Sequence, residues 1–131
     1  MSRRTPGDVR TDLHKTIIEF IEDVRDNIFT RDSEYADLEV ARWFIRGMDA
    51  PTLMERCREH ILPWKKHITA RDAAFFIKNK AIFQGLPEDK LEYFSALWKP
   101  GNTRLSPDNK EVMFVYFDTI VDLIEEHEKM K

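Results

Sequence analysis

The amino-acid sequence predicts an all-α fold, a compact single-domain helical bundle of five to seven helices around a central C-terminal helix. Three observations lead to this prediction. Apolar residues recur at intervals of three and four along most of the chain. Residues that cap helices, often followed by proline, stand at the start of these segments. The alternation of apolar and polar residues that is typical of a half-buried strand does not occur in the sequence.

The segment from Ser106 to Glu128 is the clearest helix. Ser106 suits the N-cap, Pro107 suits the first helical position, and Asp108 complements the positive end of the helix dipole. The apolar residues of this segment cover an arc of roughly 180°; they are Val112, Met113, Tyr116, Phe117, Ile120, Val121, Leu123 and Ile124. An arc this wide predicts a central helix on which several others pack. We expect Phe117, Ile120 and Ile124 to be buried, with Phe94 and Trp98 as neighbours.

Residues 1–7 are predicted to be a flexible lead, and residues 8–131 a single helical domain. Thr5, Pro6 and Asp8 together form a capping signal for a helix that runs to about Asn27. Its apolar face consists of Val9, Leu13, Ile17, Phe20, Ile21, Val24 and Ile28. A second helix is expected from about Ser33 to Arg46, and Gly47 is well placed to end it. Its predicted buried face consists of Leu38, Val40, Ala41, Phe44 and Ile45.

A third helix is expected to begin at 49–52, capped either by Asp49 or by Thr52 with Glu55, and to reach about Ile61. Pro63 ends this helix or begins the next short element. The sequence from Thr69 to Asp72 is similar to a capping box, which predicts a helix through the apolar run 75–83. That run is also compatible with a buried strand. A further helix is predicted after residue 87, with a stripe of Leu91, Phe94, Leu97 and Trp98.

Length and composition favour one soluble globular domain, because the chain has 131 residues, of which 42% are hydrophobic and 34% charged. No apolar run approaches the roughly 18 residues of a membrane span, and the N-terminus lacks a secretory signal. Cys57 is the only cysteine, so an internal disulfide is excluded. We therefore expect an intracellular protein. The net charge of −3 argues against bulk electrostatic binding of nucleic acid.

Cys57, His60 and His67 form the only group of residues that resembles a metal site. Zinc needs about four ligands, and a structural zinc site usually contains paired cysteines. The four glycines are too scattered for a phosphate-binding loop, and the carboxylates fall in helix caps or on polar faces. The sequence thus predicts no cofactor, no metal and no enzymatic activity.

Charge is distributed unevenly along the chain. Residues 56–71 carry five basic residues against one acid, a local charge of +4, whereas residues 108–128 carry seven acids against one lysine, a local charge of −6. The candidate nucleic-acid patch consists of Arg56, Arg58, Trp64, Lys65, Lys66 and Arg71. An aromatic side chain among basic residues can stack on a base. The alternative, which the acidic whole-chain charge favours, is two surfaces of opposite sign on an ordinary domain.

Trp43 lies about 100° from Phe44 on the helical wheel and therefore falls off the predicted apolar face. Arg42 and Arg46 flank it, which suits an aromatic anchor with a polar rim, and interfaces are enriched in Trp and Arg. Val115 is displaced from the apolar face of the last helix in the same way. These four residues form the candidate partner surface, for another protein or for a second copy of the chain. The alternative is that Trp43 packs under the segment 56–68 of the same domain.

Several aromatic and turn residues between about 60 and 125 also form a familiar pattern. It consists of Pro63-Trp64-Lys65-Lys66-His67-Ile68, Asp72, Phe75-Phe76, Ile82-Phe83, Gly85-Leu86-Pro87, Phe94, Leu97-Trp98, Lys110, Tyr116-Phe117 and Leu123. This pattern resembles a family of small uncharacterised proteins of nucleocytoplasmic large DNA viruses of algae and protists. That family has Ile-Trp-Lys-Tyr where this chain has residues 113–116. The resemblance brings no catalytic residues, and it implies a virion or infected-cell setting.

Taken together, these observations predict a non-enzymatic helical interaction module, as a virion component or a viral adaptor to another protein. The alternative function is accessory nucleic-acid binding through residues 56–71. No membrane association is expected.

Overall fold

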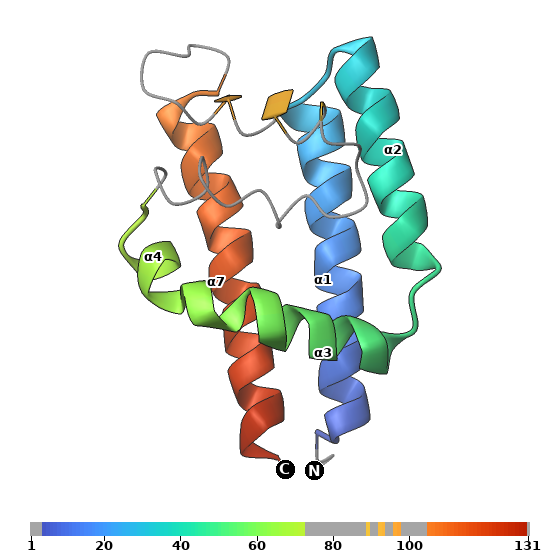
Figure 1. The fold of residues 1–131 in the computed structure, drawn as a ribbon, viewed down its shortest axis with the longest axis vertical. Helices are drawn as coiled ribbons and strands as arrows, with labels where there is room; N and C mark the ends of the chain where they lie inside the picture. The colour runs from blue at the N-terminus through green and yellow to red at the C-terminus, as the bar shows by residue number, and fades with distance from the viewer. Residues whose placement is uncertain (1–3, 73–88, 90–91, 94–95, 98–104, 131) are drawn as a thin grey trace.

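The computed structural model describes residues 4–72, 89, 92–93, 96–97 and 105–130 (Figure 1). Its elements are helices α1 (Pro6–Asn27), α2 (Asp32–Arg46) and α3 (Ala50–His60), the 3₁₀ turn η1 (Leu62–Trp64), and helices α4 (Lys65–Thr69) and α7 (Pro107–Lys129). The described residues contain no strand, which confirms the all-α class for this part of the chain. None of the described helices has the length and apolar character needed to span a membrane.

Helix α1 begins with the predicted capping box. The backbone N–H of Asp8 donates to Thr5 Oγ1 at 3.1 Å, and the backbone N–H of Thr5 donates to Asp8 Oδ2 at 2.9 Å. Pro6 is therefore helical, and α1 starts two residues before the predicted domain boundary at residue 8. Arg4 also bonds to Glu126 in α7, with Nε 3.0 Å from Oε2, so this part of the predicted lead is tied to the helical body.

The C-terminal helix α7 is capped by Ser106, whose Oγ accepts the backbone N–H of Asn109 at 3.1 Å. Its inner face is buried as expected, including Phe117, Ile120 and Ile124. Their predicted neighbours, Phe94 and Trp98, lie outside the described residues. Among the described residues, the ring of Phe20 in α1 lies beside Phe117. The Phe20 ring centroid lies 5.4 Å from that of Phe117 in an edge-to-face arrangement that aromatic pairs prefer.

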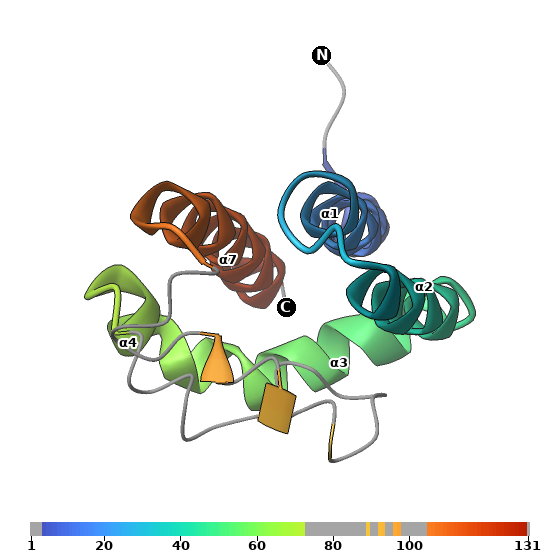
Figure 2. The same cartoon turned by 90° about the horizontal axis from the view of Figure 1, so that it is seen from above.

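Helix α1 lies between α2 and α7, and the segment from α3 through α4 crosses in front of α1 and α7 (Figures 1 and 2). Within the described part, α1 packs against α2, α3 and α7, while α7 packs against α1, α3, η1 and α4. The central position predicted for the C-terminal helix is thus shared with α1 here. The predicted run 75–83 and most of the helix after residue 87 lie outside the described residues, although Leu97 is described and buried.

Thr69 to Asp72 end a helix, which corrects the prediction that they begin one. Thr69 is the last residue of α4, and Arg71 adopts a left-handed conformation with φ of 56°. The backbone N–H of Arg71 donates to the carbonyl of Ile68, and the N–H of Asp72 donates to the carbonyl of His67 at 2.9 Å. These two bonds are those of a Schellman cap, which usually has glycine at the left-handed position. The same residue types can stand in an N-terminal capping box and in a C-terminal cap, and the backbone conformation shows that this is a C-terminal cap.

One fully buried acid was not predicted. Glu34, at the start of α2, is 0% exposed and accepts hydrogen bonds from the Tyr93 hydroxyl at 2.7 Å and from the backbone N–H of Arg31 at 3.2 Å. A buried carboxylate is tolerated when hydrogen bonds replace its hydration. Glu34 thus links the first turn of α2 to Tyr93, 59 residues later in the chain.

Candidate functional site

The buried face of α2 is narrower than the sequence predicted. Leu38 is buried, and Ala41 and Ile45 are half-buried against the core. Val40 is 51% exposed and Phe44 is 37% exposed, so their assignment to the buried face was wrong. The physical reason is that α2 stands at the side of α1 and has α3 only at its C-terminal end, so the core covers a narrow arc of the helix (Figures 1 and 2).

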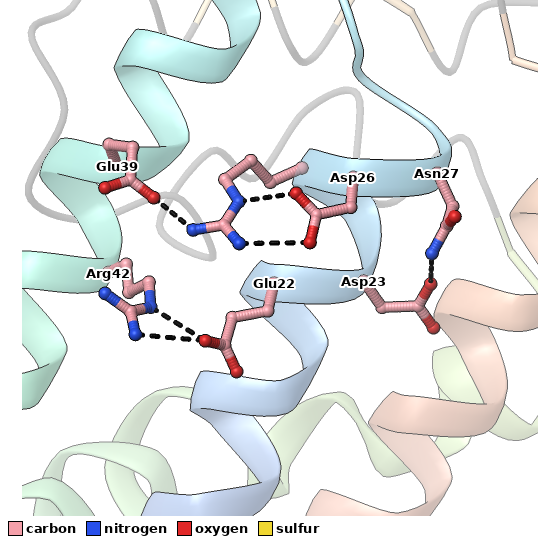
Figure 3. Close-up of polar contacts among 7 residues, drawn as sticks. Glu22, Asp23, Asp26, Asn27, Glu39 and Arg42 are labelled. Atoms are coloured by element: carbon pink, nitrogen blue, oxygen red, sulfur yellow. Dashed lines mark hydrogen bonds and ion pairs between the residues drawn. The ribbon is translucent and has the colours of Figure 1, made fainter.

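Ion pairs between α1 and α2 set the rotation of α2 about its axis (Figure 3). Arg42 Nη2 lies 3.0 Å from Glu22 Oε2, and Arg25 pairs with Glu39. A second bond to Asp26, at 2.8 Å, holds the guanidinium of Arg25 in place. These contacts draw the Glu39 and Arg42 side of α2 toward α1. The side of α2 that carries position 43 lies opposite Leu38, Ala41 and Ile45, the residues of this helix that pack on the core, and therefore faces away from α1.

The C-terminal end of α2 is fixed in the same way. The Nε2–H of His14 in α1 donates to the backbone carbonyl of Ile45 at 2.9 Å. This carbonyl lies in the last turn of the helix and also accepts the backbone N–H of Met48 at 3.1 Å. The bond from His14 therefore anchors the turn that carries Trp43 and Phe44 while leaving their side chains unrestrained by it.

Trp43 is 77% exposed, the largest exposure among the described large apolar side chains. The alternative that it packs under residues 56–68 is therefore wrong. Val40, Trp43 and Phe44 follow the i, i+3, i+4 spacing of one helix face. We call these three residues the α2 outer stripe. The sequence shows the same spacing. However, Leu38, Ala41 and Ile45 alternate with these residues, so Val40 and Phe44 were assigned to the buried face.

A hollow of about 920 Å³ opens beside the α2 outer stripe, between the end of α2 and the first turns of α3. Its lining residues are Glu39, Arg42, Trp43, Phe44, Arg46, Gly47, Met48, Thr52 and Arg56. It is a shallow surface depression, open to solvent along the helix. Such a shape fits an elongated side of a macromolecule better than an enclosed small molecule.

The arginines around the hollow have different roles. Arg42 is held by Glu22, so it is part of the contact between α1 and α2. Arg46 and Arg56 are exposed, and neither makes an ion pair with any residue in the described part of the chain. Of the two arginines predicted to flank Trp43, Arg42 thus serves the contact with α1, whereas Arg46 is available to a partner. The structure also brings in Arg56, which the sequence had grouped with the nucleic-acid patch.

Val115, the fourth residue of the predicted partner surface, is 51% exposed on α7. It does not join the α2 outer stripe, because α1 lies between α2 and α7 (Figure 2). Val112, one turn earlier, is 39% exposed, so its assignment to the apolar face of this helix was wrong. The predicted partner surface is therefore two separate surfaces, one on α2 and one on α7.

Most cations of the predicted nucleic-acid patch are paired with acids of α7. Lys65 Nζ lies 2.8 Å from Glu125 Oε2, and Arg58 Nε lies 3.6 Å from Glu128 Oε1. Arg71 Nη2 lies 2.9 Å from Asp118 Oδ2, and this hydrogen bond, together with one to Glu111, raises the pKa of the guanidinium. The positive and negative segments of the sequence thus lie face to face and neutralise one another. We call this contact the α3–α7 charged seam: Arg58, Lys65, Arg71 and their acidic partners.

Trp64, the aromatic residue of the same patch, is half-buried and packs against the core. Only Arg56 and Lys66 of the predicted patch are exposed without an ion pair in the described residues. A surface that binds a nucleic-acid backbone needs several unneutralised cations together with an accessible aromatic ring. The described geometry therefore weakens the nucleic-acid alternative.

The predicted metal-like group does not gather at one point. Cys57 is buried, and burial raises the pKa of its thiol to about 12, so the reactive thiolate is disfavoured near neutral pH. His60, one turn later, is exposed, and His67 Nδ1 lies 3.1 Å from Asp72 Oδ2. In the part of the chain that the structure describes, no three residues of the His, Cys, Asp and Glu types are arranged to hold a metal ion.

A second, smaller pocket of about 100 Å³ lies among α1, the end of α2, α3, η1 and α7. Its walls are mostly apolar and include Phe20, Phe44, Trp64 and Phe117. Small-molecule sites usually have volumes of about 300–1,000 Å³. This pocket is below that range, and we regard it as imperfect packing of the core.

Comparison of the chain with known proteins found no matching family model, no similar curated protein and no similar solved structure. The resemblance to the viral family therefore stays a prediction, and the functional argument depends on the geometry of the chain itself.

Proposed function

We propose that this chain is a non-enzymatic helical protein-interaction module that docks an acidic amphipathic helix of its partner on the α2 outer stripe. One observation carries the proposal: an anchored helix presents a 77% exposed tryptophan beside a hollow and two arginines that form no ion pair with the residues that the structure describes. A virion component or viral adaptor, in a virion or an infected cell, is the setting that we propose from the sequence resemblance. The bundle of five to seven helices around α7 belongs to the same proposal.

The chemistry of the stripe points to the kind of partner. Val40, Trp43 and Phe44 offer an apolar ridge that matches the apolar positions of another helix. Tryptophan and arginine are the residues that most often dominate binding energy at interfaces. Arg46 and Arg56 add positive charge at the rim, so acidic side chains on the partner helix would be favoured. The ion pairs between α1 and α2 hold this surface in place before binding, which lowers the entropic cost of association.

Nucleic-acid binding is the less favoured function, because the α3–α7 charged seam already engages Arg58, Lys65 and Arg71. Its own test is a mobility-shift assay with DNA and RNA at low salt. Binding that falls steeply with salt and is lost on exchange of both Lys65 and Lys66 for glutamate would favour it over our proposal.

The proposal can be tested by site-specific photo-crosslinking in source cells. A photoreactive phenylalanine derivative is introduced at Trp43, and at the exposed α1 position Lys15 as the control. We expect a cross-link that depends on position 43, with the attached segment an acidic amphipathic helix. Equal cross-linking from both positions would contradict the proposal.

The purified partner then allows a quantitative test. Trp43→Ala should weaken its binding tenfold or more with no change in melting temperature, and Arg46→Glu should weaken it more at low salt than at high salt. Lys15→Ala, which removes an exposed side chain of α1, should leave binding unchanged. If Trp43→Ala binds like the wild type, the α2 outer stripe is not the docking surface.

A further inference from the structure

We infer that the helix docked on the α2 outer stripe is the outer face of α7 in a second copy of this chain; this inference rests on the proposed function. The outer face of α7 consists of Asp108, Val112, Val115, Thr119 and Asp122. Their successive spacings of four and three place them along one side of the helix. All five residues are exposed.

The chemistry of this face complements that of the α2 outer stripe. Val112 and Val115 provide an apolar centre, and Asp108 and Asp122 provide one acid toward each end. Neither acid makes an ion pair with any residue in the described part of the chain. The α2 side has an apolar centre of three residues. Its two arginines, Arg46 and Arg56, likewise make no ion pair with any residue in the described part of the chain. Arg46 and Arg56 both line the hollow at the C-terminal end of α2, so either Asp108 or Asp122 of a second copy can meet them there.

The neighbouring acids of α7 do not compete for this role, because they have partners inside the chain. Glu111 and Asp118 both bind Arg71, and Glu126 binds Arg4. These internal pairs leave Asp108 and Asp122 as the acids of the outer face that can attract a cation from outside.

The two surfaces cannot meet within one molecule, because α1 lies between α2 and α7 (Figures 1 and 2). A contact between them therefore joins two copies, and the surface used on one copy differs from the surface used on the other. Such head-to-tail contacts leave one surface of each kind free at the ends, so they extend into chains or close into rings. The contact area of one helix on a shallow hollow is below that of a standard interface, and we expect micromolar or weaker affinity.

The test uses the full chain and measures its average mass by sedimentation over roughly 10 μM to 1 mM, the range in which a small interface associates. The wild type should grow in mass with concentration, and added salt should reduce this growth. Trp43→Ala and Val115→Asp should each remain monomeric. Thr11→Asp, which adds the same charge at an exposed position of α1, should assemble like the wild type. Circular dichroism and melting curves establish that each variant is folded.

Mixing the two monomeric variants gives the decisive result. Val115→Asp retains the α2 outer stripe, and Trp43→Ala retains the outer face of α7, so an equimolar mixture should form a dimer of twice the monomer mass and nothing larger. Absence of this dimer, or a wild type that stays monomeric throughout, would overturn the inference. If Val115→Asp assembles like the wild type while Trp43→Ala does not, the stripe binds another surface of the copy. In that case this inference fails, and the docking role of the stripe stands.

Failure of the proposed function itself has a different signature, since it would appear as position-independent cross-linking at Trp43 and Lys15. A monomeric wild type with position-specific cross-linking to another protein would overturn self-association alone.

Discussion

Two tryptophans in this chain stand beside arginines and lysines in the sequence, and the fold treats them in opposite ways. Trp64 is half-buried, and the cations around it pair with acids of α7 in the α3–α7 charged seam. Trp43 is exposed, and Arg46 and Arg56 near it have no ion pair in the described residues. An aromatic residue with basic neighbours therefore indicates a binding surface only when no other part of the same chain satisfies those groups.

The comparison also shows how an external surface is held in place by internal contacts. The seam uses its charges to join elements that are far apart in the sequence, with Lys65 and Glu125 separated by 60 residues. On α2, the charges at positions 39 and 42 are used in the same way against α1. What remains on α2 after this internal pairing is the α2 outer stripe, which is why we assign it to a partner.

The largest expected loss of stability comes from Phe117, an aromatic residue that is packed inside the domain. Phe117 is 1% exposed and has the rings of Phe20 and Phe114 beside it. Phe117→Ala should lower the free energy of unfolding by about 3–5 kcal/mol, because it leaves a cavity in the core. Chemical denaturation followed by circular dichroism measures this. A loss below about 1 kcal/mol would mean that α7 does not pack as described.

Trp64→Ala should give the next largest effect. The indole packs against the core but is only half-buried, so we expect a loss of roughly 2–3 kcal/mol, below the range for a fully buried tryptophan. The same denaturation experiment measures it. If Trp64→Ala were nearly neutral, Trp64 would resemble Trp43, the comparison would break down, and the nucleic-acid alternative would regain support.

Arg71 tests the seam through both its side chain and its backbone. Arg71→Ala removes the pairs with Glu111 and Asp118 and the contact with the Phe114 ring, so we expect a loss of about 1–2 kcal/mol; the strain of a Cβ at this φ is the same as in the wild type. Arg71→Gly removes the same pairs but suits a φ of 56°, so it should be more stable than Arg71→Ala by up to about 1 kcal/mol. Equal stability of the two variants would contradict the Schellman cap.

Alkaline pH should destabilise the contact between α1 and α7. Burial, and then the hydrogen bond to Asp23, raise the pKa of Tyr116 from 10 to about 12. The contribution is fully present below pH 10, and it is lost as the pH rises toward 12, because the unfolded chain releases this proton first. We expect a loss of about 1–2 kcal/mol over this interval. Tyr116→Phe should make the decline shallower in unfolding curves recorded between pH 9 and 12, and an unchanged slope would exclude Tyr116 as its source.

The features that the sequence predicted correctly depend on interactions between residues that are close together in the chain. Thr5 with Asp8, and Ser106 with Pro107, cap their helices as expected, because an N-cap needs only a side chain and the next turn of backbone. Of the two candidates for the third helix, Asp49 is the N-cap and accepts the backbone N–H of Thr52. The buried residues of α1 followed from period 3.6 in the same way. On α7 the same reasoning found Phe117, Ile120 and Ile124, but it missed the buried residues Phe114 and His127.

The remainder depends on which helices become neighbours, and sequence spacing does not contain that information. Val40 and Phe44 were expected in the core, but α1 and α3 cover only part of α2. The burial of Glu34 depends on Tyr93, 59 residues away. The neutralisation of Arg58, Lys65 and Arg71 depends on α7 lying beside α3 and α4. Trp43 was recognised as unusual for a reason that is local, its displacement from the helix face.

The stability of Trp43→Ala in dilute solution tests the central claim most directly, since that claim is that the fold does not need this side chain. Because Trp43 is 77% exposed, urea unfolding curves of the variant and the wild type should agree within about 0.5 kcal/mol. Val115→Ala serves as the matched control for loss of an exposed apolar side chain. A loss above about 1 kcal/mol for Trp43→Ala, beyond that of the control, would place Trp43 within the fold and contradict its assignment to a partner.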